Sequence, residues 1–220
     1  VAVSPDGSLQ VTVTKNGALV FRDTVTTKVI RRGHLWMLSS LVVFNADGRL
    51  IAVAGAGGVS IVDAESAEEI VRIPGPRSVS CCLAFSPRSD RLAIGDREDV
   101  DAEATSGPSS ATSTAGHRSI RVYSVSDEKP LMKLECGNRS LAAIAFSVDG
   151  DELFAAVYDK VKVWDIRQRS QRVEIEPADN LTTLTFDKSG ELLATVHDAH
   201  VVVRDAATGM PQKRLTLEGG

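Results

Sequence analysis

The sequence predicts an all-β fold in which one four-stranded unit is written five times along the chain. Three observations lead to this expectation. A strand closed by a turn of small and polar residues returns with a nearly constant period. A second, β-branched landmark follows each of these turns by about 15 residues, and helical periodicity is almost absent between the two.

The first landmark is an alternating apolar strand that runs into a tight turn. Its copies are VAVSPDG, LVVFNADG, CLAFSPRSD, AIAFSVDG and TLTFDKSG, which end at Gly7, Gly48, Asp90, Gly150 and Gly190. Three of the four intervals are 40 to 42 residues long and the fourth is 60. Ser, Pro, Asp and Gly at the end of each copy are the residues that tight connections between strands require.

The second landmark is a β-branched stretch that ends on a small polar residue, Asp in four of its copies. These copies are LVFRD, VSIVD, IRVYS, VKVWD and VVVRD, which end at Asp23, Asp63, Ser124, Asp165 and Asp205. Their intervals are 40, 61, 41 and 40 residues. Two independent landmarks therefore keep one period, and both lengthen by about 20 residues at the same place. The Trp164-Asp165 pair belongs to a repeat.

Two more strands complete each unit, one between the landmarks and one after the second. Four-stranded units of about 40 residues cannot bury both faces alone, so neighbours must stack and the stack must curve. The sequence therefore predicts a β-propeller that forms a single domain over 1–220. The approximate repeats are 1–33, 34–75, 76–136 with an insertion at 96–118, 137–177 and 178–220.

Four motifs resemble those of the WD40 repeat family. They are SPDG at 4–7, the Gly33-His34 pair, VKVWD at 161–165 and DAATG at 205–209. The resemblance covers essentially the whole chain and implies a propeller of four-stranded antiparallel blades. It also implies a structural signature, to which we assign Gly33, His34, Asp159, Trp164 and Asp165.

The family further implies a hydrogen-bonded tetrad in each blade, which joins the Gly-His histidine to a Ser or Thr, an Asp and the Trp. No unit of this chain keeps the full set. The unit with His34 has Gly57 at the place of the turn Asp and Val62 at the place of the Trp, and the unit with Trp164 has Asn138 where the His is expected. We therefore expect these blades to depend more on apolar packing.

The five units lack only the lead-in to the first one. The chain is then either a complete five-bladed ring or part of a larger propeller, for which seven blades are usual in the family. We expect a fragment, because neither end of the sequence resembles a terminus.

The amino-acid composition indicates which kinds of partner and which cellular setting to expect. With 25% charged and 43% hydrophobic residues, a net charge of −4 and a pI of about 5.6, nothing in the composition indicates a general affinity for nucleic-acid phosphates, so we expect no direct nucleic-acid binding. No apolar run reaches the roughly 20 residues that span a bilayer, so we expect no membrane insertion by this segment. Cys81, Cys82 and Cys136 form no C-x-x-C pair, which favours a reduced intracellular setting, cytoplasmic or nuclear.

No motif of catalysis or cofactor binding is present. The chain lacks G-x-S-x-G, a P-loop and a dinucleotide fingerprint, so we predict no catalytic residue and no cofactor. His197 and His200 fall in a turn between strands rather than on a helix face, so we predict no metal site there either. Two alternatives stay open: a propeller hydrolase with carboxylates around a central channel, and a sensor or regulatory domain of a larger protein.

We expect instead a non-catalytic scaffold or adaptor that binds other proteins, as a subunit of a complex. GHLWMLSS places Leu35, Trp36 and Met37 in a connection on the face that the family uses for docking. Trp36 either covers the rim of the core or is an exposed anchor, since Trp is enriched in interface hot spots. Arg77, Arg139 and Asn180 occupy comparable connections and could supply polar contacts.

The insertion at 96–118 interrupts the period. It opens with five acidic residues and continues in Ser, Thr, Gly and Ala, a composition that cannot bury enough apolar area to order itself. It is either a tolerated surface insertion or an acidic arm whose hydroxyls gain charge on phosphorylation and meet a basic partner.

Overall fold

The computed structural model describes residues 1–36, 39–55, 57–75, 82–97, 118–175, 181–187, 189–198 and 200–216. Within these ranges every regular element is a β-strand. No helix in the described part of the chain is long and apolar enough to cross a membrane.

The strands form five antiparallel sheets of four, and each sheet is made of strands consecutive in the sequence. The first sheet contains β1 (Ala2–Val3), β2 (Leu9–Val13), β3 (Ala18–Asp23) and β4 (Val29–His34). The second contains β5 (Ser39–Phe44), β6 (Leu50–Gly55), β7 (Gly58–Asp63) and β8 (Glu69–Pro74). The third contains β9 (Cys82–Phe85), β10 (Arg91–Arg97), β11 (Arg118–Ser124) and β12 (Pro130–Gly137).

The last two sheets repeat the same plan. The fourth contains β13 (Leu141–Phe146), β14 (Glu152–Val157), β15 (Lys160–Asp165) and β16 (Ser170–Ile175). The fifth contains β17 (Leu181–Phe186), β18 (Leu192–His197), β19 (His200–Asp205) and β20 (Pro211–Thr216). The strand order within each sheet is the sequence order, so every connection inside a sheet is a hairpin.

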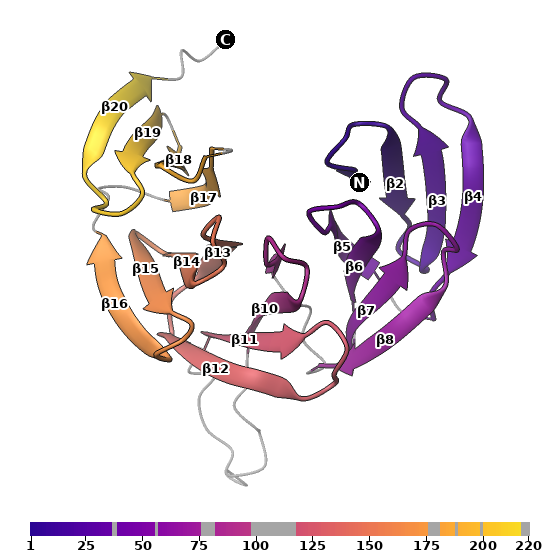
Figure 1. Ribbon diagram of the computed structural model, residues 1–220, viewed down its shortest axis with the longest axis horizontal. Coiled ribbons are helices and arrows are strands. Elements are labelled where there is room, and N and C mark those ends of the chain that lie inside the picture. Colours follow the sequence, from indigo (N-terminus) through magenta and orange to yellow (C-terminus); the bar gives the residue numbers. More distant parts are fainter. Residues whose placement is uncertain are drawn as a thin grey trace, which may run out of the picture.

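The five sheets follow one another along an open arc, with the fourth strand of each on the outer side (Figure 1). The first strands contact one another on the inner side, β1 with β5, β5 with β9, β9 with β13 and β13 with β17. The described strands form no closed barrel or ring. The repeated four-stranded unit that the sequence predicts is thus confirmed, as an all-β array of five sheets.

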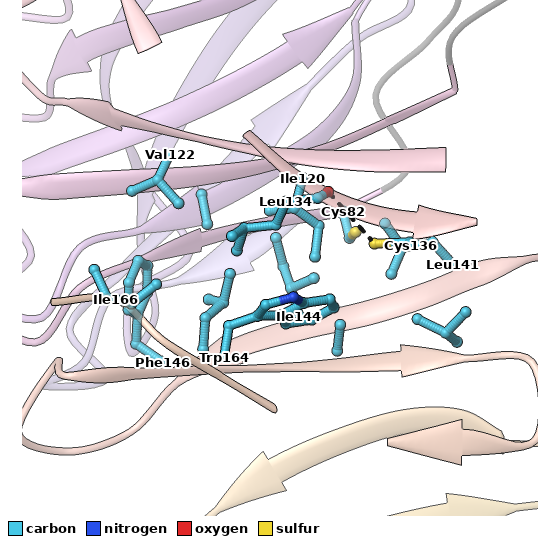
Figure 2. Close-up of a cluster of buried hydrophobic side chains, with 14 residues drawn as sticks. Cys82, Ile120, Val122, Leu134, Cys136, Leu141, Ile144, Phe146, Trp164 and Ile166 are labelled. Atoms are coloured by element: carbon cyan, nitrogen blue, oxygen red, sulfur yellow. Dashed lines mark hydrogen bonds between the residues drawn. The ribbon is translucent and has the colours of Figure 1, made fainter. Parts of the chain in front are cut away.

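The core lies between neighbouring sheets. Because side chains alternate across a strand, the second strand of an inner sheet sends Ile51 to the cluster shared with the first sheet and Ala52 to the cluster shared with the third. Strand β6 is therefore buried on both faces, whereas β18, at the end of the arc, alternates buried and half-buried residues. Figure 2 shows the cluster between the third and fourth sheets, with Trp164 packed among apolar side chains.

A repeated side-chain contact builds the turn between the first and second strands. In every unit an oxygen at the start of this turn accepts the backbone N–H of the residue five positions later. The pairs are Ser4 with Leu9, Asn45 with Leu50, Ser86 with Arg91, Ser147 with Glu152 and Asp187 with Leu192. Short side chains that bond the local backbone favour turns over regular structure, which explains why Ser, Asn and Asp recur at this place.

A second repeated contact builds the turn between the third and fourth strands. The Asp that ends the third strand accepts the N–H of the residue three positions later. The pairs are Asp23 with Thr26, Asp63 with Ser66, Asp165 with Gln168 and Asp205 with Thr208. These bonds account for the Asp of the second landmark in the sequence.

The expected insertion at 96–118 needs a correction at its ends. Asp96 and Arg97 belong to β10 and Arg118 belongs to β11. Asp96 is 2% exposed and its carboxylate lies 3.5 Å from Nη2 of Arg121, so this acid belongs to the sheet and not to the acidic loop. The remainder of the insertion, 98–117, lies outside the described residues.

Candidate interaction surface

The connections that the sequence assigns to docking lie at one end of the sheets. Because the strands alternate in direction, the turn between the second and third strands and the linker to the next sheet emerge at the same end. We call this end the linker face; it carries Gly17, Trp36, Arg139 and Tyr158. Backbone hydrogen bonds connect the linkers to these turns. The N–H of Leu35 donates to Gly17 O at 2.9 Å, that of Gly75 to Gly57 O at 3.1 Å, and that of Tyr158 to Ser140 O at 2.7 Å.

Leu35 and Trp36 are adjacent in the linker after β4 but have opposite environments. The Leu35 side chain is 2% exposed and belongs to the core cluster between the first and second sheets. Trp36 is 85% exposed, and its ring lies 4.9 Å from that of His34 at an interplanar angle of 60°. Leu35 therefore anchors the linker, while Trp36 presents a large aromatic surface to solvent. Leu35 itself offers no exposed contact to a partner.

Arg139 and Tyr158 form a second exposed aromatic feature on the linker face. The Arg139 guanidinium lies 4.9 Å from the centre of the Tyr158 ring, a cation–π contact. Tyr158 is 45% exposed and adopts a φ of 59°, a left-handed conformation that turns the chain from β14 into β15. Its carbonyl accepts the N–H of Leu181 at 3.3 Å, which ties this turn to the fifth sheet.

A groove of about 260 Å³ runs beside Arg139 and Tyr158. Two of its charged groups form an ion pair, with Lys160 Nζ 2.5 Å from Glu174 Oε1, and Lys162 Nζ donates to the Cys136 carbonyl at 3.3 Å. The hydrogen bond from Lys160 is the main reason why the pKa of Glu174 lies below its usual value, with the charge of Lys160 adding to it. The groove is polar, and its Lys160, Lys162 and Glu174 side chains are used in structural contacts.

Only part of the predicted docking set lies in the described structure. Met37, Arg77 and Asn180 fall outside the described residues. Trp36 and Arg139 lie on the same face but in different linkers, after β4 and after β12. Tyr158 was missed by the sequence analysis. Its only signal was an aromatic residue directly before Asp159, in a turn where most repeats have small or polar residues.

The signature residues of the repeat have structural roles. A Cβ on Gly33 would lie 2.9 Å from the Ala67 carbonyl oxygen, so the close approach of two chains requires glycine there. His34 is exposed beside Trp36, and its side chain makes no hydrogen bond with another described residue. Trp164 is 4% exposed in an apolar cluster, and Asp159 is half-buried in the β14–β15 turn. Apolar packing, not a hydrogen-bonded tetrad, surrounds this Trp.

No known family model matches the chain, and no characterised protein matches it in sequence. Among the described residues, no three His, Cys, Asp or Glu side chains gather as a metal site would require. Cys82 and Cys136 are both buried in the core, and Cys81 lies outside the described residues. The linker face therefore presents two exposed aromatic side chains, Trp36 and Tyr158, beside a groove that contains the Lys160–Glu174 ion pair.

Proposed function

We propose that this chain is a non-catalytic scaffold that binds other proteins through the linker face, as part of a WD40-like β-propeller. The observation that carries the proposal is the exposure of Trp36, 85% in a linker that Leu35 holds in place. An exposed Trp on an ordered backbone loses little conformational entropy on binding and is typical of interface hot spots.

The architecture supports the propeller part of this proposal. Five sheets with one strand order, each packed on the next in sequence order, are what a blade repeat produces. The arc curves so that the first strands lie on its inner side and the fourth strands on its outer side, as in the blades of a propeller (Figure 1). The motif resemblance to WD40 repeats points the same way.

The two aromatic features suggest how a partner would bind. Trp36 with His34 would supply an apolar anchor, and the Arg139–Tyr158 pair would supply a cation and a ring about two sheets away along the arc. Affinity would then come from a few anchors, not from the total buried area. An intracellular multiprotein complex is the setting that we propose.

The test compares partner capture by the chain and by its W36A variant. Tagged versions are expressed in the source cells, and the proteins purified with each are quantified by mass spectrometry. We expect at least one protein to bind the wild type and to lose about tenfold or more of its occupancy with W36A, as hot-spot truncation does. The matched control is V25A, because Val25 is 88% exposed but lies in the β3–β4 turn at the opposite end of the sheets.

A direct measurement follows with the purified partner. Titration calorimetry should give weaker binding for W36A and for Y158A, and unchanged binding for V25A. If W36A and V25A bind every recovered partner alike, the linker face is not the docking surface and the proposal fails.

A further inference from the structure

The fifth sheet carries four buried polar side chains on the face that packs against the fourth sheet. Thr195 and His197 of β18, and His200 and Arg204 of β19, all point toward the fourth sheet and are 0%, 2%, 7% and 6% exposed. Leu193, on the same face, belongs to the core cluster that joins the two sheets. The network is therefore built into an interface between sheets.

These groups form a connected set of hydrogen bonds. The Thr195 hydroxyl donates to the Val202 carbonyl at 3.2 Å, so it accepts from His197 Nε2 at 3.2 Å and from Arg204 Nε at 3.4 Å. The rings of His197 and His200 stack at 4.7 Å. Nη2 of Arg214 on β20 lies 2.9 Å from His200 Nε2 and 3.1 Å from His200 Nδ1, and because a guanidinium only donates, an imidazole nitrogen accepts this bond.

Arg204 is a buried charge with neutral partners. Besides Thr195, its guanidinium donates to the Gly209 carbonyl at 3.1 Å, and no carboxylate among the described residues pairs with it. Burial lowers the pKa of Arg204, yet a guanidinium stays charged in proteins. A buried charge that no carboxylate of the described residues compensates is costly, so this position favours an anion.

Arg204 lines a groove of about 330 Å³ that opens beside the outer strand β20. Its described walls combine basic and neutral side chains, with no acidic one: His200, Val202, Arg204, Pro211, Gln212, Lys213 and Arg214. The same place in the fourth sheet is neutralised, because Glu174, one repeat before Arg214, pairs with Lys160, one repeat before His200. The fifth sheet replaces that carboxylate by a guanidinium.

We propose that this groove binds a phosphate group between Arg204 and Arg214. Two guanidinium groups offer several donors in planar forks, which match the oxygens of a phosphate better than a single lysine does. His200 and Gln212 add polar groups at the wall. The site lies on the outer rim of the fifth sheet and so differs from the linker face; it does not depend on the scaffold proposal.

The test titrates the purified chain with three probes at constant ionic strength near neutral pH, by calorimetry. The probes are inorganic phosphate, a short neutral peptide with one phosphoserine, and its unphosphorylated twin. We expect saturable binding of phosphate, of the phosphopeptide or of both, and none of the unphosphorylated peptide. Tighter binding of the phosphopeptide would assign the site to phosphorylated proteins, and equal or tighter binding of inorganic phosphate would assign it to the free anion.

Two variants and one control locate the binding. R204Q removes the charge but keeps a polar side chain, and R214Q changes an exposed side chain that folding tolerates; each should weaken binding by about tenfold to a hundredfold. R172Q is the control, because Arg172 lies on β16 and is paired with Glu152 outside the groove. Absence of saturation by both phosphate probes, or affinities in R204Q and R214Q equal to that of R172Q, would overturn the proposal. R214Q decides the matter if R204Q does not fold.

Discussion

Arg204 occupies in the fifth sheet the position that Trp164 occupies in the fourth. Trp164 pairs with Leu153 and Arg204 with Leu193, and both leucines are fully buried at 0% exposure. Both side chains point toward the preceding sheet, Trp164 into an apolar cluster and Arg204 into a polar network. The same repeat position therefore holds a packed aromatic ring, Trp164, in the fourth sheet and a charged side chain, Arg204, in the fifth.

This contrast predicts that Arg204 is not needed for stability. Replacing a buried charge by an apolar side chain of similar volume is often neutral or stabilising by about 1–4 kcal/mol, because the desolvation cost of the charge is removed. We therefore expect R204M to keep or raise the free energy of unfolding, measured by urea denaturation, while it loses phosphate binding. A loss of more than about 1 kcal/mol would mean that the hydrogen bonds to Thr195 and Gly209 contribute more than the charge costs.

The two tryptophans should respond in opposite ways to truncation. Trp164 is 4% exposed in a packed cluster, so W164A should leave a cavity and lower the free energy of unfolding by about 3–5 kcal/mol. Trp36 is 85% exposed, so W36A should change it by less than about 0.5 kcal/mol. Urea unfolding followed by far-UV circular dichroism measures both. Equal losses would show that Trp36 packs against the protein in solution.

Two glycines with positive φ should differ in their tolerance of a side chain. A Cβ on Gly58, at a φ of +139°, would overlap the Ile73 carbonyl oxygen, so G58A must move β7 away from β8. We expect a cost of about 3 kcal/mol or more. Gly137 has a φ of +88° and nothing within 4 Å of that position, so G137A should cost only the backbone strain of about 1–2 kcal/mol. Thermal unfolding of the two variants, side by side, tests this difference.

The turn aspartates should make the protein sensitive to acid. Hydrogen bonds from Ser4 and Ser8 lower the pKa of Asp6 from 3.8 to about 2, and bonds from nearby backbone and hydroxyl groups lower the pKa of Asp23, Asp63, Asp149, Asp187 and Asp205. Between about pH 4 and pH 2 the unfolded chain then binds more protons than the folded one. Stability is therefore complete above the unfolded pKa and falls as the pH drops through this window.

Urea midpoints measured from pH 6 down to pH 2 test this prediction. The midpoint should fall below about pH 4, and D6N should fall less steeply because one of the shifted carboxyls is gone. K15Q serves as the control, since it changes the charge of an exposed side chain and leaves all of the turn carboxyls in place. A midpoint that stays level down to pH 2 would mean that the turn hydrogen bonds are equally formed in the unfolded chain.

Local chemistry explains how much of the architecture was predictable. Ser4, Asn45 and Asp187 bond to backbone groups only five residues away, and Asp23 and Asp205 to groups three residues away. Both partners of such a contact lie within a few residues of each other, so the contact can be recognised in the sequence as a turn motif. The number of units, their period and the order of the four strands could therefore be predicted before any coordinates.

The interaction surface was only partly predictable. The sequence placed Leu35 and Trp36 together in a linker, but their opposite exposures depend on the second sheet, against which Leu35 packs. Tyr158 became a candidate only once Arg139, in another connection, was found over its ring. The residues around Leu35 and Tyr158 in the sequence therefore do not reveal either contact.

The amino-acid sequence determined the repeating strand pattern and its turns, because alternation and short-range hydrogen bonds need no distant partner. The tertiary structure alone decided what each repeated position does. Trp164 and Arg204 stand at one place in the repeat, yet the residues that surround them come from neighbouring sheets far away in the chain. Burial and electrostatic compensation are properties of that environment, so the basic groove of the fifth sheet emerges only when the sheets stack.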